Sequence, residues 1–116
     1  MQNILVVDDN EELLDTLDIL ITTFGFNVAV ATSYDSLIKT FEEYLPDAII
    51  LDVVLGNEDG RQICKRLKSD PKTSKICVIL LSAKSNFLEN PEGCLADGVL
   101  MKPFDITAFK KIIKNF

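Results

Sequence analysis

The feature that most constrains the fold is a regular alternation of short apolar runs with longer segments of helical periodicity. The five apolar runs are Ile4–Val7, Val28–Ala31, Ala48–Leu51, Ile76–Leu81 and Val99–Met101. Each run is short enough for a strand and apolar enough to be buried on both faces of a sheet. The alternation predicts an α/β domain with a parallel sheet covered by helices on both faces. Right-handed crossovers leave only a few doubly wound topologies for such a chain.

The segments between the runs carry the start and stop signals of helices. Ser33 and Asp105 are placed to cap the second and the last helix, and Gly25 follows the first helix, where a left-handed residue is favoured. The segment Lys84–Asp97 is interrupted by proline and glycine. It is therefore predicted to be irregular rather than a full helix between the last two strands.

Length and composition narrow the class of protein. The 116 residues suit one domain, 1–116, which is either a complete small protein or one piece of a longer chain. A net charge of −6 argues against direct binding of nucleic acid, which needs a basic patch. No apolar stretch approaches membrane-spanning length and the first residues lack the pattern of a signal peptide, so a cytoplasmic protein that does not insert into a membrane is expected.

The charges and the cysteines lead to two further expectations. Residues 1–58 hold twelve acidic side chains and one basic, whereas residues 59–116 hold six and eleven. We hypothesise that the acidic first and second helices lie beside the basic last and third helices, so that opposite charges face each other. Cys64, Cys77 and Cys94 include no CxxC pair, and the chain has no histidine. Buried free thiols are therefore expected rather than a zinc site.

Polar residues follow four of the five apolar runs. Asp8 and Asp9 follow the first run, Asp52 the third, Ser82 the fourth and Lys102 the fifth. In an open doubly wound sheet the carboxyl ends of the strands share one edge, and ligands bind there. Taken singly, each residue has an ordinary explanation, as a helix cap, a turn or loop residue, or a solvated side chain. Their shared placement favours a functional site.

The types of side chain indicate the chemistry of that site. Crowded carboxylates repel one another, and a divalent cation relieves the repulsion. Oxygen ligands without histidine or cysteine favour a hard ion such as Mg²⁺, which completes its shell with waters and phosphate oxygens. A hydroxyl and an ammonium group beside such an ion suit the remaining oxygens of a phosphoryl group, and a carboxylate nucleophile would yield an aspartyl phosphate.

Four blocks of this sequence resemble the signature blocks of response-regulator receiver domains. They are Ile4–Glu12 (ILVVDDNEE), Ile49–Gly60 (IILDVVLGNEDG), Leu80–Ala83 (LLSA) and Leu100–Phe104 (LMKPF). The resemblance runs from Gln2 to about Asn115. It implies one flavodoxin-like domain with a five-stranded parallel sheet of order 2-1-3-4-5 and helices on both faces.

The resemblance also implies roles for the polar residues. Asp52 matches the phosphoacceptor and Asp9 the direct Mg²⁺ ligand. Asp8 matches a neighbour that acts through a metal-bound water, and the backbone carbonyl of Val54 matches the group that completes the metal shell.

On the phosphoryl side of the site, the resemblance implies three further matches. Ser82 matches the switch hydroxyl that moves toward the phosphoryl group. Lys102 matches the lysine that pairs with that group, and Pro103 matches a proline that follows a cis peptide bond.

The sequence departs from the family pattern at three places. Val99 stands where an aromatic switch residue is usual, and Gly56 stands where a proline is common. The segment Lys84–Asp97 looks short for the family's fourth helix. These departures put in doubt the usual output surface, which is built from the fourth helix, the fifth strand and the fifth helix, rather than the phosphorylation chemistry.

The expected function is a signalling switch that accepts a phosphoryl group on Asp52, with Mg²⁺, from a sensor histidine kinase or a phosphotransfer protein. It would act on an unknown output partner, as a monomer or a weak activation-dependent dimer, and would not turn over a separate substrate. The alternative is an interaction module that works without phosphorylation. A Mg²⁺-dependent phosphatase is disfavoured because no Asp-x-Asp follows the first run, and a flavin binder because the acidic loop at residues 8–12 would repel a phosphate.

Overall fold

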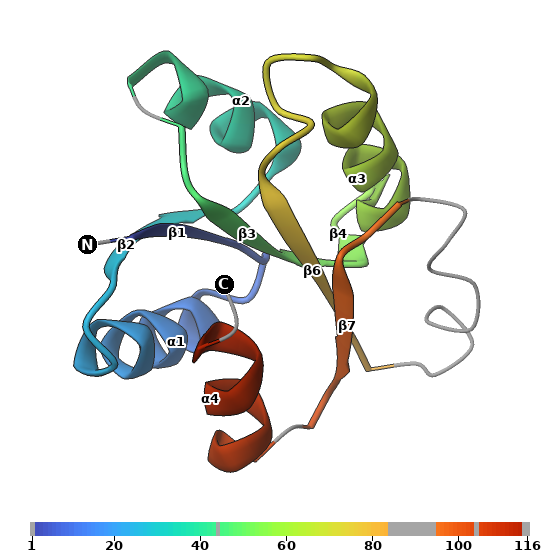
Figure 1. Ribbon diagram of the computed structural model, residues 1–116. Helices are drawn as coiled ribbons and strands as arrows, with labels where there is room; N and C mark the ends of the chain where they lie inside the picture. The colour runs from blue at the N-terminus through green and yellow to red at the C-terminus, as the bar shows by residue number, and fades with distance from the viewer. Residues whose placement is uncertain (1, 44, 84–94, 104, 115–116) are drawn as a thin grey trace.

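A five-stranded parallel sheet forms the centre of the computed structural model (Figure 1), which describes residues 2–43, 45–83, 95–103 and 105–114. The sheet strands are β1 (Asn3–Val7), β2 (Asn27–Ala31), β3 (Ala48–Asp52), β6 (Cys77–Ser82) and β7 (Gly98–Met101). Their order is β2-β1-β3-β6-β7. Since β6 and β7 are the fourth and fifth of the predicted strands, the predicted order 2-1-3-4-5 is confirmed.

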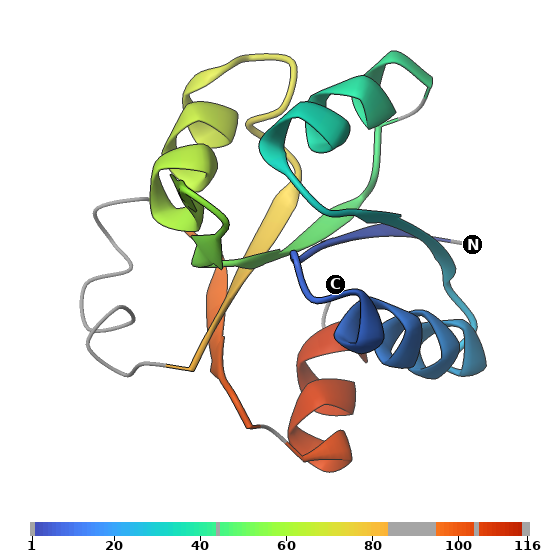
Figure 2. The same cartoon turned by 180° about the vertical axis from the view of Figure 1, so that it is seen from behind.

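Two helices cover each face of the sheet (Figures 1 and 2). The helices are α1 (Glu11–Thr23), α2 (Tyr34–Glu43), α3 (Gly60–Ser69) and α4 (Ile106–Lys114). Both views show α1 and α4 on one face and α2 and α3 on the other. The predicted doubly wound, flavodoxin-like architecture is therefore confirmed for the described residues.

The alternation of side chains along the central strands builds two cores. In β1, Leu5 and Val7 pack on the side of α2 and α3, against Leu37 and Ile63. The intervening Ile4 and Val6 pack on the other side with residues of α1 and α4. These four apolar side chains of β1 have no exposed surface, as expected for a strand covered on both faces.

The helix ends follow the predicted capping chemistry. Ser33 Oγ accepts a hydrogen bond from the backbone N–H of Ser36 at the start of α2, and Asp105 Oδ1 accepts one from Ala108 in α4. Gly25 follows α1 with a left-handed φ of +98°. These polar groups satisfy helix ends that would otherwise lack partners, so the chain turns where the sequence predicts.

A small antiparallel hairpin, which was not predicted, follows β3. Its strands are β4 (Val54–Leu55) and β5 (Glu58–Asp59), and Gly56 in the turn has φ +59°. The hairpin ends at Asp59, whose side chain accepts a hydrogen bond from Arg61 N–H and caps α3. It therefore connects the end of a central strand directly to the next helix.

The predicted helix neighbours are found, but ion pairs are not what joins them. The guanidinium of Arg66 in α3 lies 5.2 Å from the ring centroid of Tyr34 in α2. The ammonium of Lys110 in α4 lies 5.6 Å from the ring centroid of Phe24, the C-cap of α1. Within the described part of the chain, no ion pair joins α1 to α4 or α2 to α3. Cation–π contacts replace the hypothesised charge pairs.

The cysteines and the helix lengths bear on two other expectations. Cys64 is buried and Cys77 is half-buried, and both are free thiols; Cys94 lies outside the described residues. No helix in the described ranges is long and apolar enough to cross a membrane.

Candidate functional site

The carboxyl ends of four strands bring the predicted polar residues to one edge of the sheet. Asp8 follows β1, Asp52 ends β3, Ser82 ends β6 and Lys102 follows β7. The exposed fractions of Asp8, Asp52 and Ser82 are 0%, 7% and 1%. The strand order reverses between β1 and β3, because β2 lies on one side of β1 and all later strands of the sheet lie on the other. A doubly wound sheet opens a ligand crevice at such a point.

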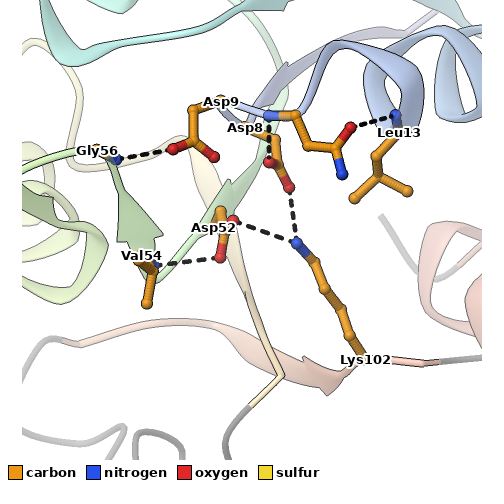
Figure 3. Close-up of polar contacts among 8 residues, drawn as sticks. Asp8, Asp9, Leu13, Asp52, Val54, Gly56 and Lys102 are labelled. Carbon is orange, nitrogen blue, oxygen red and sulfur yellow. Dashed lines mark hydrogen bonds and ion pairs between the residues drawn. The ribbon is translucent and has the colours of Figure 1, made fainter.

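Lys102 joins the two buried carboxylates. Its ammonium nitrogen lies 2.8 Å from Asp8 Oδ2 and 3.2 Å from Asp52 Oδ2 (Figure 3). Its side chain is 21% exposed, so it is not the solvated lysine that its position before a proline would suggest. The peptide bond between Lys102 and Pro103 is cis, as expected from the resemblance.

A backbone amide holds one oxygen of each of the three carboxylates (Figure 3). The donors are Asn10 to Asp8 Oδ1 at 2.9 Å, Val54 to Asp52 Oδ1 at 3.2 Å, and Gly56 to Asp9 Oδ2 at 3.1 Å. Lys102 occupies the second oxygen of Asp8 and of Asp52. Among the described residues, no hydrogen bond reaches the second oxygen of Asp9. The backbone thus fixes one oxygen of each carboxylate. The second oxygens of Asp8 and Asp52 contact the side chain of Lys102, which can move away, whereas that of Asp9 has no hydrogen-bond partner among the described residues.

Burial sets the electrostatics of the site. Desolvation is the main cause that raises the pKa of Asp52, and the negative charge of Asp8 adds to it, although Lys102 acts in the opposite direction. Burial also disfavours the charge on Lys102. Its hydrogen bond to Asp8 and its attraction to Asp52 and Asp8 outweigh that effect and raise the pKa of the lysine. The site therefore holds more negative charge than one lysine offsets.

The residues present fit a hard divalent cation. One oxygen from each of Asp8, Asp9 and Asp52 lies within 4.8 Å of the others. The donor set contains only oxygen, which suits Mg²⁺ rather than zinc or copper. The carbonyl of Val54 as a further ligand stays a prediction; the structure places the amide of this residue on Asp52.

The N-cap of α1 is Asn10, the last of three successive polar residues, Asp8, Asp9 and Asn10, any of which has a side chain suited to a cap. Its side chain accepts a hydrogen bond from Leu13 N–H at 3.2 Å. Asp8 and Asp9 therefore do not cap α1, and their side chains are turned to the edge of the sheet (Figure 3). The ordinary explanation of these two carboxylates as helix caps does not hold.

Two glycines beside Asp52 were part of a motif but had no predicted role. A methyl group on Gly60 would meet the backbone carbonyl oxygen of Asp52, so only glycine fits there. Gly56 supplies the amide that holds Asp9. The pair Gly56-Asn57 was a local turn signal in the sequence. Nothing in the sequence indicates the contact between Gly56 and Asp9, which lie 47 positions apart.

The predicted switch residues are only partly described. Ser82 is buried, and its carbonyl oxygen accepts a hydrogen bond from the backbone N–H of Lys102 at 2.7 Å. Val99 is half-buried and packs on the core beneath α2 and α3. Most of the segment Lys84–Asp97, namely residues 84–94, lies outside the described residues, as does Phe104.

Comparison with known proteins agrees with this geometry. The family model of the response regulator receiver domain matches residues 4–114. The chain is 33% identical over 114 residues to Histidine kinase P4 of Formosa agariphila, covering 97% of this chain and 8% of that protein. It is 31% identical over 105 residues to the transcriptional regulatory protein AfsQ1 of Streptomyces coelicolor, covering 89% of this chain and 45% of that protein. The chain thus spans less than half the length of either relative.

Solved structures show the same likeness. A putative response regulator from Chloroflexus aurantiacus superposes with a TM-score of 0.89 at 28% identity, covering 98% of this chain and 95% of that one. The signal receiver domain of a histidine kinase from Syntrophus aciditrophicus gives a TM-score of 0.90 at 25% identity, covering 99% and 89%. By the family match over nearly its whole length, the shared fold and the acidic edge of its sheet, the chain belongs to the response regulator receiver domains.

Proposed function

We propose that this domain is a phosphorylation-controlled switch that accepts a phosphoryl group on Asp52 in a Mg²⁺-dependent reaction. The donor would be the phosphohistidine of a sensor kinase or a phosphotransfer protein in the cytoplasm. The observation that carries the proposal is a carboxylate at the end of β3 that is almost buried, beside two further carboxylates and in hydrogen-bond contact with Lys102.

The acceptor step follows from the contacts of Asp52. A carboxylate oxygen of Asp52 attacks phosphorus and forms an O–P bond while the P–N bond of the phosphohistidine breaks. The electron pair of that bond leaves with the imidazole nitrogen, which then takes a proton. Bound Mg²⁺ would offset negative charge on the phosphoryl oxygens.

The residues around Asp52 prepare it for this step. Val54 N–H fixes Asp52 Oδ1, so the side chain is oriented before a donor arrives. The raised pKa of Asp52 reflects a poorly solvated, more basic carboxylate, which is a better nucleophile once it is ionised. Lys102 supplies a cation to an incoming phosphoryl oxygen in place of its present carboxylate partners.

The output of the switch is proposed to pass through the strand next to β3. Ser82 ends β6, and its carbonyl contacts the backbone of Lys102, so a shift at the phosphoryl group reaches β6 and β7 together. A phosphorylated and an unphosphorylated conformation would then differ in affinity for a partner. No turnover of a separate substrate is proposed.

A second candidate is an interaction module on the same fold that works without phosphorylation. Val99 favours it, because this position on β7 lacks the aromatic ring that the family pattern has there. A partner that binds equally well to the protein with and without a phosphoryl group would support this candidate.

The proposal is tested by intact-protein mass spectrometry after incubation with acetyl phosphate and Mg²⁺. We expect one added phosphoryl group in the wild type and in Asp47→Asn. We expect none in Asp52→Asn or in the presence of EDTA. Asp47 is a matched control because it lies just before the start of the same strand, is exposed, and is far from the acidic edge.

Two results would count against the proposal. Phosphoryl addition to Asp52→Asn at the wild-type level would assign the acceptor elsewhere. Failure of the wild type both to gain mass from acetyl phosphate and to bind the non-covalent phosphoryl mimic beryllofluoride in calorimetry would leave the interaction module as the better account.

A further inference from the structure

We propose that Gly56 is a positioning residue of the metal site, whose backbone N–H orients Asp9 to bind a divalent cation. This inference rests on the proposed Mg²⁺-dependent function and adds a residue to it. It is particular to this chain, because the position where the family pattern commonly has proline is here a glycine, which has a backbone N–H to donate.

The contact itself is long-range and specific. Gly56 N–H donates to Asp9 Oδ2 at 3.1 Å, across 47 positions of the sequence (Figure 3). Asp9 is exposed, unlike Asp8 and Asp52, and Lys102 does not reach it. Among the described residues, the Gly56 amide is the only hydrogen-bond partner of this carboxylate. Without it, the Asp9 side chain would sample several rotamers, and a cation would have to order it.

The backbone of the hairpin aims two amides at the site. Val54 and Gly56 are two residues apart, and their N–H groups hold Asp52 Oδ1 and Asp9 Oδ2 respectively. The register of the hairpin, Val54 with Asp59 and Leu55 with Glu58, fixes their spacing. The hairpin β4–β5 thus fixes one oxygen of Asp52 and one of Asp9, two of the three carboxylates of the cluster. Groups that orient metal ligands in this way commonly change metal affinity 10- to 100-fold.

Only a residue with an amide and a left-handed backbone can make this contact. Gly56 has φ +59°, whereas proline is locked near φ −65° and has no N–H. A methyl group at Gly56 would meet nothing within 4 Å. Alanine therefore keeps the N–H at some conformational cost, and proline removes it.

The first test measures Mg²⁺ binding to the unphosphorylated chain by isothermal titration calorimetry. We expect Gly56→Pro to raise the dissociation constant about tenfold. We expect Gly56→Ala, which retains the donor, to stay within about threefold of the wild type. Equal affinity of folded Gly56→Pro and the wild type would overturn the inference. Loss of binding in both variants alike would assign the effect to backbone strain and would also overturn it.

The second test uses amide hydrogen exchange and does not require a folded proline variant. In the wild type, the Gly56 amide should exchange slowly, and in Asp9→Ala it should exchange faster while the amides of β1 stay protected. An amide that exchanges equally fast in both proteins would show that the hydrogen bond is absent.

The outcomes separate this inference from the function on which it rests. If the wild type binds Mg²⁺ and is phosphorylated but Gly56→Pro binds Mg²⁺ equally well, only the role of Gly56 fails. If the wild type does not bind Mg²⁺ at all, the metal-dependent function and this inference both fail.

Discussion

At the scale of single residues, Asp52 is the side chain whose charge is most clearly disfavoured by its surroundings. A carboxylate that is almost buried is unfavourable when ionised, and Asp8 beside it increases the cost. Lys102 offsets part of that cost but is shared with Asp8. The side chain is retained in an environment that disfavours its charge, which is typical of a group kept for its chemistry rather than for stability.

Replacing Asp52 by asparagine should therefore stabilise the metal-free protein. Because the pKa of Asp52 is raised in the folded state, its contribution to stability is present at acidic pH and is lost as the pH rises through that pKa. At pH 7 we expect Asp52→Asn to raise the free energy of unfolding by about 0.5–2 kcal/mol, and the difference should shrink toward acidic pH. Urea denaturation at several pH values, in EDTA, measures this.

The control for this prediction is Asp15→Asn, which removes an exposed carboxylate of α1. We expect it to change stability by less than about 0.5 kcal/mol. A destabilised Asp52→Asn at pH 7 would show that the contact with Lys102 outweighs the burial of the charge.

Gly60 should tolerate no larger residue. At an open helix position, replacing glycine by alanine stabilises by up to about 1 kcal/mol. Here the added methyl group would meet the carbonyl oxygen of Asp52 at the end of β3. We expect Gly60→Ala to destabilise by about 1–3 kcal/mol and to lower the rate of phosphorylation by acetyl phosphate.

Lys65→Ala, on the exposed surface of the same helix, is the comparison for Gly60→Ala. It should leave both the thermal midpoint and the phosphorylation rate near those of the wild type. If Gly60→Ala were as stable as Lys65→Ala, the close approach of α3 to Asp52 would not constrain the site.

At the scale of elements, the sequence predicts the sheet well because each strand is a continuous apolar run. The observed strands extend the predicted runs by one residue or shift them by one, as for β6, which starts at Cys77 rather than Ile76. The hairpin β4–β5 was missed because strands of two residues, such as Glu58–Asp59, carry no periodicity. Its signal is local turn chemistry alone.

The same difference separates the site residues that were predicted from those that were not. Asp8 and Lys102 follow strands and Asp52 ends one, so topology alone brings them together. The role of Gly56 depends on a backbone amide and a tertiary contact, which side-chain patterns do not reveal. Likewise, sequence leaves open which of three neighbouring polar residues caps α1, because all three have suitable side chains.

The edge of the sheet opposite the site is held by Lys68 of α3. Its ammonium group lies 2.6 Å from both the carbonyl oxygen of Ile76 and Asp97 Oδ2. Asp97 Oδ2 in turn accepts a hydrogen bond from Val78 N–H in β6. One partly buried amine therefore ties α3 to the beginnings of β6 and β7.

Lys68→Met should destabilise the protein by about 1–3 kcal/mol, because it leaves a buried carbonyl and a carboxylate without their charged donor. Lys65→Met, one turn earlier on the exposed side, should have little effect. Chemical denaturation measures both. We expect the phosphorylation rate of folded Lys68→Met to equal that of the wild type, since the contact lies at the far end of the strands. Equal stability of the two variants would contradict the role of Lys68 as an anchor.

At the scale of the whole molecule, the acidic site lies at the carboxyl ends of the strands, and the contacts of Lys68 lie at the opposite ends. The carboxyl edge gathers charges that destabilise the fold, and the apolar strands β1 and β3 between the helix layers supply the compensating burial. Within the described residues, the acidic first half and the basic second half of the chain meet in ion pairs at the site, where Lys102 contacts Asp8 and Asp52, and no ion pair involves a carboxylate of α1. The surface of α1 therefore keeps its negative charge, which favours partners with a basic surface.

The central claim is that Asp52, and no other carboxylate of the acidic edge, carries the phosphoryl group. The most direct measurement treats the protein, phosphorylated with acetyl phosphate and Mg²⁺, with borohydride, which reduces an aspartyl phosphate to homoserine. Peptide mass mapping then locates the homoserine. We predict homoserine at position 52 alone, and none when EDTA is present. Homoserine at position 8 or 9, or an added phosphoryl group that yields no homoserine, would contradict the account.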